Sequence, residues 1–221
     1  SALASGSEDE LVVYAINDDG SLSEQPVGAA TSTLRDNAEG RNLPSAIGFQ
    51  IVGDNYVVVT EAREFRPDGL PPAFTELQSG SVSTWQIQAD GSLAPINMDV
   101  PSGNRATESG RTACWLDLNE AGDVFFVSNA LEAGLAAFSF NEGQIELLDE
   151  LAAEGTGAGT TTNPQEAFAT TDGWIYLWVA DNYLYQCYGL DGTIGVYRID
   201  GSNLTLVEEV SGDLPEVNTQ G

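Results

Sequence analysis

A hairpin pattern occurs four times along this chain: an alternating strand, a tight turn that ends in glycine, and a second strand. The turn glycines are Gly20, Gly91, Gly143 and Gly201. A short turn with glycine between alternating segments is a strong hairpin signal, because glycine readily adopts the positive φ that such turns require. Repeats of roughly 40–50 residues, each a small antiparallel sheet, predict an all-β fold and favour a β-propeller.

Strongly apolar segments precede three of the hairpins and complete four strands per unit. A near-continuous apolar strand is typical of a sheet that packs on both faces, as propeller blades do. We expect these second strands at residues 55–61, 123–129 and 174–182. We expect an innermost strand before each, at residues 45–52, 112–119 and 165–171. In this assignment, residues 183–188 form an insertion in the last unit.

The first unit is too short to hold four strands. Only about ten residues precede its third strand, whereas a strand is ordinarily ~5–6 residues long. The sequence therefore predicts a single partial domain, a β-propeller with about three and a half four-stranded antiparallel blades. Its parts are an outer half-blade at 1–30, blades at 45–100, 110–150 and 163–210, and the start of a closing strand at 211–221. An open β-sandwich is the alternative.

Such an array has open edges, and unpaired strand edges favour pairing with further strands. We therefore expect a partner at residues 1–30. This partner is either the N-terminal remainder of the propeller or a second copy of this chain.

The chain has a formal net charge of −27, and its seven basic residues are all arginine. A charge of this sign repels nucleic acid and anionic membranes, so neither is expected as a partner. An acidic surface suits a saline or acidic environment, and we expect an extracellular or cell-surface protein. Acidic pairs such as Asp18 and Asp19 lack the ligand spacing of a calcium loop, so no metal site is predicted. No apolar run approaches the ~20 residues of a membrane-spanning helix.

The two cysteines, Cys114 and Cys187, lie in neighbouring predicted units. An even number of cysteines in an extracellular chain permits a disulfide, and adjacent blades would bring these two together. Two buried thiols are the alternative. Asn203 begins the sequence Asn-Leu-Thr, a glycosylation acceptor in a secreted eukaryotic protein.

Several segments are similar to the lactonase-family β-propellers, which include propeller-type 6-phosphogluconolactonases and fungal carboxymuconate cyclases. The segments are GRTACW at 110–115, FVSNA at 126–130, VVTEA at 58–62 and GTIGVYR at 192–198. The resemblance implies a seven-bladed ring, of which this chain would supply about half. It also implies lactone chemistry.

The residue types available for catalysis are few. The chain contains no histidine and no lysine, which excludes a Ser-His-Asp triad and a lysine Schiff base within it. Lactone hydrolysis needs a group that stabilises the oxyanion and a base. Arg111, Glu166 and Glu61 are the candidates, because each begins or ends a strand near the end of a propeller channel. Their alternative role is a surface salt bridge or a solvated charge.

An aromatic segment offers a different kind of site. Tyrosine rings provide contact area and a hydrogen-bonding group at the water boundary. The candidate residues for binding a sugar, a lactone or another ring are Tyr183, Tyr185, Tyr188 and Asn129. Tyr176 and Trp178 are expected to pack between blades instead.

Two functions from different classes follow. The first, which we prefer, is a noncatalytic secreted propeller that binds a ligand or partner and needs no cofactor. The alternative is a lactone hydrolase or isomerase that uses arginine and carboxylate groups and is completed by the missing N-terminal half. A propeller supports many functions, so the resemblance alone does not decide between them.

Overall fold

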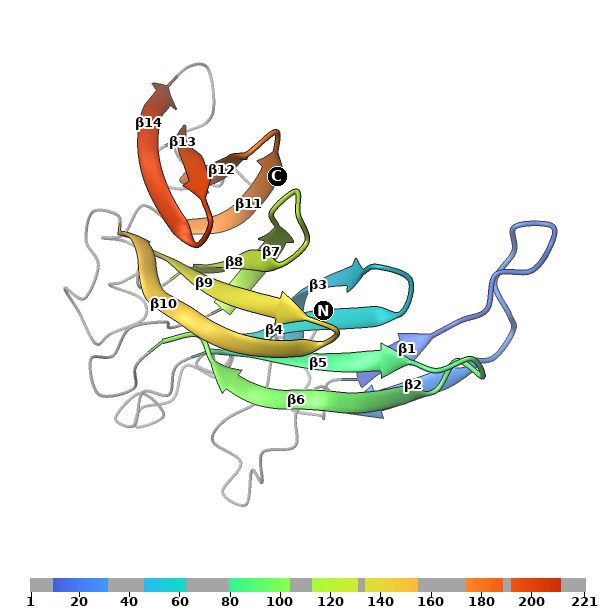
Figure 1. Ribbon diagram of the computed structural model, residues 1–221. Coiled ribbons are helices and arrows are strands. Elements are labelled where there is room, and N and C mark those ends of the chain that lie inside the picture. Colours follow the sequence, from blue (N-terminus) through green and yellow to red (C-terminus); the bar gives the residue numbers. More distant parts are fainter. Residues whose placement is uncertain are drawn as a thin grey trace, which may run out of the picture.

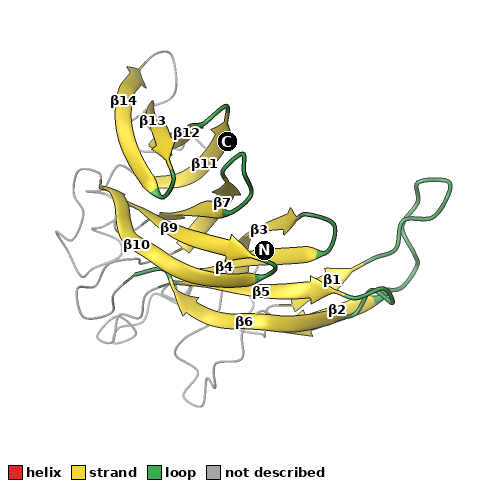
Figure 2. Cartoon of the chain, in the orientation of Figure 1, coloured by secondary structure: helices red, strands yellow, loops and turns green. Residues whose placement is uncertain are grey.

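The computed structural model describes residues 10–31, 46–62, 80–103, 113–130, 134–154, 174–188 and 192–211. Within these ranges the chain forms strands β1 to β14 and no helix, which confirms the all-β prediction (Figure 2). No helix in the described part is therefore long and apolar enough to cross a membrane.

Three sheets have four antiparallel strands each, arranged in chain order from β3 to β14 (Figure 1). Blade 1 contains β3 (Ala46–Val52), β4 (Tyr56–Glu61), β5 (Ser81–Ile87) and β6 (Leu93–Pro101). Blade 2 contains β7 (Ala113–Leu118), β8 (Val124–Asn129), β9 (Gly134–Asn141) and β10 (Gln144–Glu154). Blade 3 contains β11 (Trp174–Ala180), β12 (Tyr183–Tyr188), β13 (Thr193–Asp200) and β14 (Asn203–Ser211). The N-terminal hairpin pairs β1 (Glu10–Val13) with β2 (Gly28–Thr31).

Blades 1 and 2 have the strand order that the sequence predicts, but the first two strands of the third unit were assigned wrongly. Residues 174–180 form the first strand of blade 3, and residues 183–188 form its second strand rather than an insertion. The expected innermost strand at 165–171 lies outside the described residues. The turn between β11 and β12 consists of Asp181 and Asn182, both at positive φ. Asp and Asn tolerate this conformation better than most other non-glycine residues, so a tight hairpin forms here without glycine.

The first strands of the three blades lie side by side, and the sheets stack through two apolar layers. Asp117 on β7 links these strands, because its carboxylate accepts hydrogen bonds from Gln50 Nε2 on β3 at 3.0 Å and from the backbone N–H of Val179 on β11 at 2.7 Å. Trp115 on β7 stacks on Tyr176 of β11 with ring centroids 4.7 Å apart, so the packing role expected for Tyr176 is confirmed.

The layer between blades 1 and 2 includes Val58, Val82, Leu116 and Phe125. The layer between blades 2 and 3 includes Phe126, Leu135, Leu184 and Tyr188. Because β8 contributes to both layers, all six of its residues are buried. This burial matches the two-sided packing that its continuous apolar sequence predicts.

The same irregularity recurs between the first and second strands of each blade. The pairing shifts between Ala46 and Phe49 in blade 1, and equivalent shifts occur in blades 2 and 3. In blade 1 the Thr60 hydroxyl accepts a hydrogen bond from Gly48 N, and in blade 2 the Ser128 hydroxyl accepts one from Trp115 N. These bulges give an internal numbering: Phe49, Leu116 and Leu177 are equivalent, as are Val58, Phe126 and Tyr185.

The expected disulfide is absent, since neither Cys114 nor Cys187 is disulfide-bonded. Cys187 occupies the position in β12 that Ser128 occupies in β8. Side chains alternate along β12, and its buried residues Leu184 and Tyr188 face blade 2. Cys187 therefore faces away from blade 2, where Cys114 lies on β7. The sequence assignment failed because it placed Cys187 in an insertion rather than in a strand.

Candidate functional site

Glu61 is the one candidate catalytic residue within the described part of the chain. It ends β4 and is fully buried. Its carboxylate accepts hydrogen bonds from Ser81 Oγ at 2.5 Å and from Ser83 Oγ at 3.1 Å. Both serines lie on β5, so the carboxylate joins the end of one strand to the start of the next. Arg111 and Glu166 lie outside the described residues.

Asn129 occupies the position in blade 2 that Glu61 occupies in blade 1. It ends β8, is 1% exposed, and accepts a hydrogen bond from Ser102 Oγ at 3.0 Å. Ser102 follows the last strand of blade 1 and is itself fully buried. Asn129 therefore ties blade 2 to blade 1, and its side-chain oxygen faces protein rather than water.

Tyr188 is the third residue at this repeated position, at the end of β12. Its ring is buried between blades 2 and 3, and its hydroxyl lies 2.7 Å from that of Tyr197. Gly195 gives the ring its space, since a Cβ there would lie 2.1 Å from the Tyr188 hydroxyl oxygen. The three equivalent residues Glu61, Asn129 and Tyr188 thus all make structural contacts, between neighbouring strands or between neighbouring blades.

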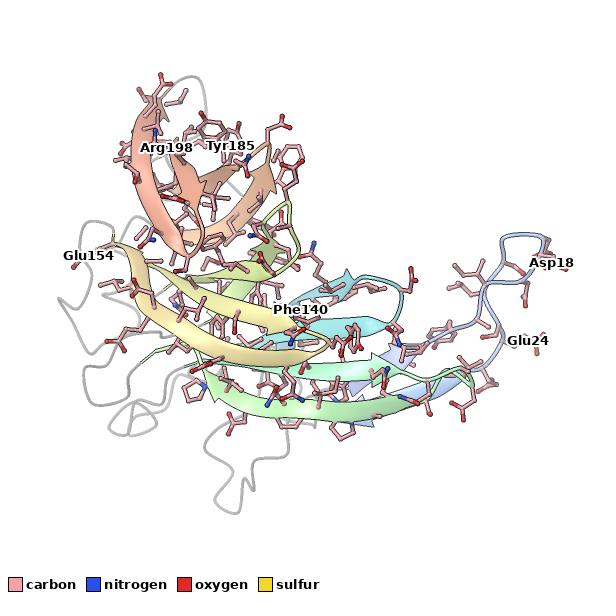
Figure 3. All side chains as sticks on the ribbon, viewed as in Figure 1. Asp18, Glu24, Phe140, Glu154, Tyr185 and Arg198 are labelled. Atoms are coloured by element: carbon pink, nitrogen blue, oxygen red, sulfur yellow. The ribbon has the colours of Figure 1, made fainter. Side chains whose placement is uncertain are left out.

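Tyr183 and Tyr185 alternate with Tyr188 and lie on the opposite face of blade 3. On β11, Trp178 pairs with Tyr185, and the two ring centroids are 6.5 Å apart. Arg198 on β13 pairs with Tyr183 and is exposed. We call Trp178, Tyr183, Tyr185 and Arg198 the aromatic face; Figure 3 labels Tyr185 and Arg198 on this blade.

Trp178 corrects one expectation from the sequence. It was assigned to packing between blades, but 67% of its surface is exposed. Tyr183 and Tyr185 are half-buried. Strand alternation places all three residues on one face. The sequence would have shown this grouping if β12 had been recognised as a strand.

Other chemistry is sparse in the described ranges. There, no group of three or more cysteine, aspartate and glutamate side chains lies close enough to hold a metal ion. Burial raises the pKa of the Cys114 thiol to about 12 and also raises the pKa of Cys187. Neither cysteine is therefore poised as a thiolate nucleophile at neutral pH.

No family model matches this sequence, and no curated protein matches it. Solved structures do share its fold. A candidate 6-phosphogluconolactonase from Bacteroides uniformis superposes with a TM-score of 0.62 and 14% identity, over 93% of this chain and 52% of the other. The periplasmic gluconolactonase of Pseudomonas aeruginosa gives 0.54 and 14%, over 90% and 48%. A protein from Lactobacillus plantarum gives 0.55 and 11%, over 93% and 53%.

These comparisons define the class of fold: the chain folds as β-propeller blades similar to those of the lactonase structures, as the sequence resemblance implies. It spans about half the length of these solved structures. Sequence identities at this level establish the fold and leave the activity open.

Proposed function

We propose that this chain is a noncatalytic module that binds a protein partner through its aromatic face. The observation that carries the proposal is Trp178, a large ring with 67% of its surface in water on a well-paired sheet. Such rings are enriched at the centres of protein interfaces, together with tyrosine and arginine. Tyr185 and Arg198 supply those two residue types beside Trp178.

The internal repeat supports a covered state for this face. Val58 and Phe126, the equivalents of Tyr185 in blades 1 and 2, are both fully buried beneath the next blade. At the same strand position in blades 1 and 2, the side chain is therefore buried by a neighbouring sheet. A partner sheet of complementary shape would bury Tyr185 in the same way.

Charge limits the kind of partner. The chain carries a net charge of −27, and Arg198 is the one arginine within the described residues. Complementary potentials favour association and like charges oppose it. The partner surface should therefore be neutral or basic around an apolar centre.

The proposal places the protein outside the cell. Support comes from the acidic composition and from Asn203, which starts β14 and is exposed, as a glycosylated asparagine must be. Peptide mapping of the secreted fraction for a glycan at Asn203 tests this location.

The test of partner binding is hydroxyl-radical footprinting of the native extracellular assembly against the isolated 23.3 kDa chain. Partner binding should protect Trp178 and Tyr185 at least tenfold, whereas Ile16, 76% exposed at a hairpin turn, should react equally in both. Trp178→Ala should prevent reassembly with the isolated partner. Equal reactivity of Trp178 in both samples would contradict the proposal. Protection of Trp178 in the isolated chain by methyl glucoside alone would also contradict it and would favour a sugar site.

Lactone hydrolysis or isomerisation is the second candidate. The fold shared with a gluconolactonase and the buried carboxyl group of Glu61 favour it. Against a role as general base, both Glu61 oxygens accept serine hydroxyl hydrogen bonds. If this chain takes part in catalysis, the native assembly should hydrolyse gluconolactone and folded Glu61→Gln should not. If the chain is a binding module, the native assembly and the Glu61→Gln variant should both leave gluconolactone to hydrolyse at the uncatalysed rate.

A further inference from the structure

The first strand of blade 1 presents apolar side chains to water at positions that the other blades bury. Phe49 and Ile51 are 66% and 55% exposed. Leu116, the equivalent of Phe49 in blade 2, is 8% exposed within the layer that blade 1 covers. Leu177 and Val179, the equivalents of Phe49 and Ile51 in blade 3, pack against the layer that blade 2 covers. In blades 2 and 3, the preceding blade therefore buries or partly buries these two positions.

The N-terminal hairpin supplies only the outer half of such a preceding blade. Its turn matches the β5–β6 turn bond for bond: Gly20 N donates to Asn17 O as Gly91 N donates to Gln88 O, both at 2.9 Å. Ser21 N likewise donates to Asp19 as Ser92 N donates to Asp90, both at 3.0 Å. The strands β1 and β2 are therefore the third and fourth strands of a blade, and its first and second strands are not among the described ones.

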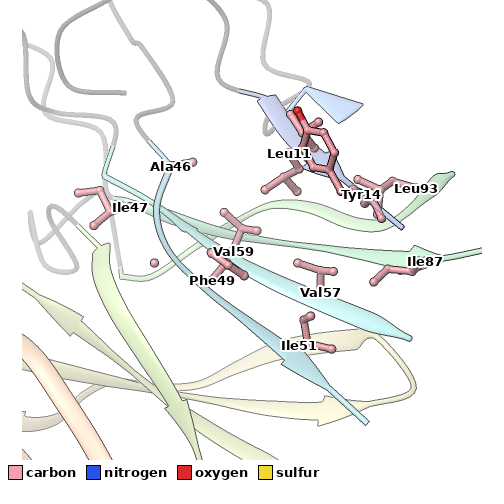
Figure 4. A pocket seen from close by; sticks show the side chains of 13 residues that line it. Leu11, Tyr14, Ala46, Ile47, Phe49, Ile51, Val57, Val59, Ile87 and Leu93 are labelled. Atoms are coloured by element: carbon pink, nitrogen blue, oxygen red, sulfur yellow. The ribbon is translucent and has the colours of Figure 1, made fainter. Parts of the chain in front are cut away.

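An apolar groove lies where those two strands would run. It has a volume of about 500 Å³ and lies between β1 and the exposed face of blade 1 (Figure 4). Leu11 and Tyr14 line one side, and Phe49, Ile51, Val57 and Val59 line the other. Among the described residues, no charged side chain lines it. Among the described strands, β1 pairs along one edge only, with β2 in a two-stranded sheet.

We propose that this groove is the docking site for a pair of β-strands, the first and second strands of one blade. They come from a polypeptide that supplies the other half of the ring. The second strand of the pair hydrogen-bonds to the open edge of β1, and its apolar side chains cover Phe49 and Ile51. Strand addition of this kind takes affinity from main-chain hydrogen bonds and specificity from side-chain pockets.

A second copy of this chain does not fit the groove as well. At its far end a copy would present blade 3, a sheet that already has four strands. At its near end it would bring another hairpin of third and fourth strands. Neither end of the described array provides the missing pair, whereas the solved lactonase structures are about twice as long as this chain.

The test appends a strand pair of the required kind to the whole chain. A copy of residues 113–129, which hold β7 and β8, is fused ahead of residue 1 through a flexible Gly/Ser linker of about 15 residues. Docking should slow hydrogen exchange of the β1 amides at least tenfold and raise the urea midpoint of unfolding. A matched fusion with Phe126→Asp in the appended copy should show neither effect.

Substitutions in the groove identify the docking surface. Phe49→Asp with Ile51→Asp should lower the midpoint of the unfused chain only slightly, because both side chains are already more than half exposed. In the fused chain the same pair of substitutions should abolish the gain. The proposal is overturned if the fusion gives no protection of β1, or if the gain persists in the doubly substituted chain. Dimerisation of the unfused chain with protected β1 amides would also overturn it, in favour of a second copy.

Discussion

Replacing Thr60 with valine should destabilise the chain more than replacing it with serine. Thr60 is fully buried in β4, and its hydroxyl fills the bulge opposite β3. The hydroxyl oxygen accepts a hydrogen bond from Gly48 N at 3.0 Å. Its proton can be donated to the carbonyl of Gly48 at 3.2 Å or to the carbonyl of Cys114 on the first strand of blade 2. One side chain therefore joins two strands and two blades.

The magnitude follows from the groups left behind. Valine keeps the shape of threonine but removes the acceptor for one buried N–H and the donor for one buried carbonyl. A buried polar group without a partner costs about 1–3 kcal/mol, so the two groups together should cost Thr60→Val about 2–6 kcal/mol. Thr60→Ser keeps the hydroxyl and removes one buried methyl group, which costs about 1 kcal/mol.

Urea unfolding of the two variants measures this difference. With a slope of about 2 kcal/mol/M, Thr60→Val should lower the midpoint by roughly 1–3 M and Thr60→Ser by about 0.5 M. In blade 2, Ser128→Ala removes the acceptor for Trp115 N and should cost about 1–3 kcal/mol. If the valine variant proves as stable as the serine variant, the hydroxyl is not what holds the bulge, and the reasoning fails.

Two further predictions concern titrating groups. Without reductant, the denatured chain should react with Ellman's reagent at both thiols, and detection of no free thiol would restore the disulfide. In the native chain at pH 8, Cys187 should be alkylated faster than the more deeply buried Cys114. The hydrogen bond from the Ser92 hydroxyl lowers the pKa of Asp90. The stabilisation from this hydrogen bond is therefore present above about pH 4, and it is lost as the pH falls through the folded-state pKa of Asp90. Ser92→Ala should raise the pKa of Asp90 in an NMR titration, and an unchanged value would contradict the assigned cause.

The parts of the fold that the sequence predicted are those fixed by local chemistry. Gly91, Gly143 and Gly201 all adopt positive φ in the turns where the pattern placed them. The first strands of blades 1 and 2 lie at 46–52 and 113–118, within a residue of the predicted ranges. Turn geometry and alternating polarity are both determined within a few residues, so one sequence suffices to find them.

Blade 3 shows where this approach fails. Its first turn uses Asp181 and Asn182 at φ values of 50° and 61°. Without a glycine to mark it, the turn was included in a strand, so β11 was assigned as the second strand and β12 as an insertion, whereas the hairpin of β13 and β14 was predicted correctly. The error also produced the incorrect pairing of Cys114 with Cys187, since it hid the face to which Cys187 belongs.

The role of Glu61 could not be predicted because its partners are distant in sequence. Ser81 and Ser83 follow it by 20 and 22 residues, beyond a long connection, and nothing in either segment specifies the register that brings them to the carboxylate. A buried carboxylate that accepts hydrogen bonds avoids the large cost of an unpaired charge. The strand register therefore decides whether the Glu61 carboxylate is available for catalysis or serves as a hydrogen-bond acceptor that joins β4 to β5.

The burial patterns of the second strands show how many faces of each blade are covered. In β8 every residue is buried, because blade 2 has a blade on both sides. In β12 burial alternates, because only the face with Leu184 and Tyr188 meets another blade. The open face carries aromatic side chains at positions where β8 carries Phe126. Blade 1 is open on its other side, where the hairpin leaves Phe49 in water. Apolar side chains are therefore exposed at both ends of the described array, whereas the blade between them has a neighbouring blade on each face.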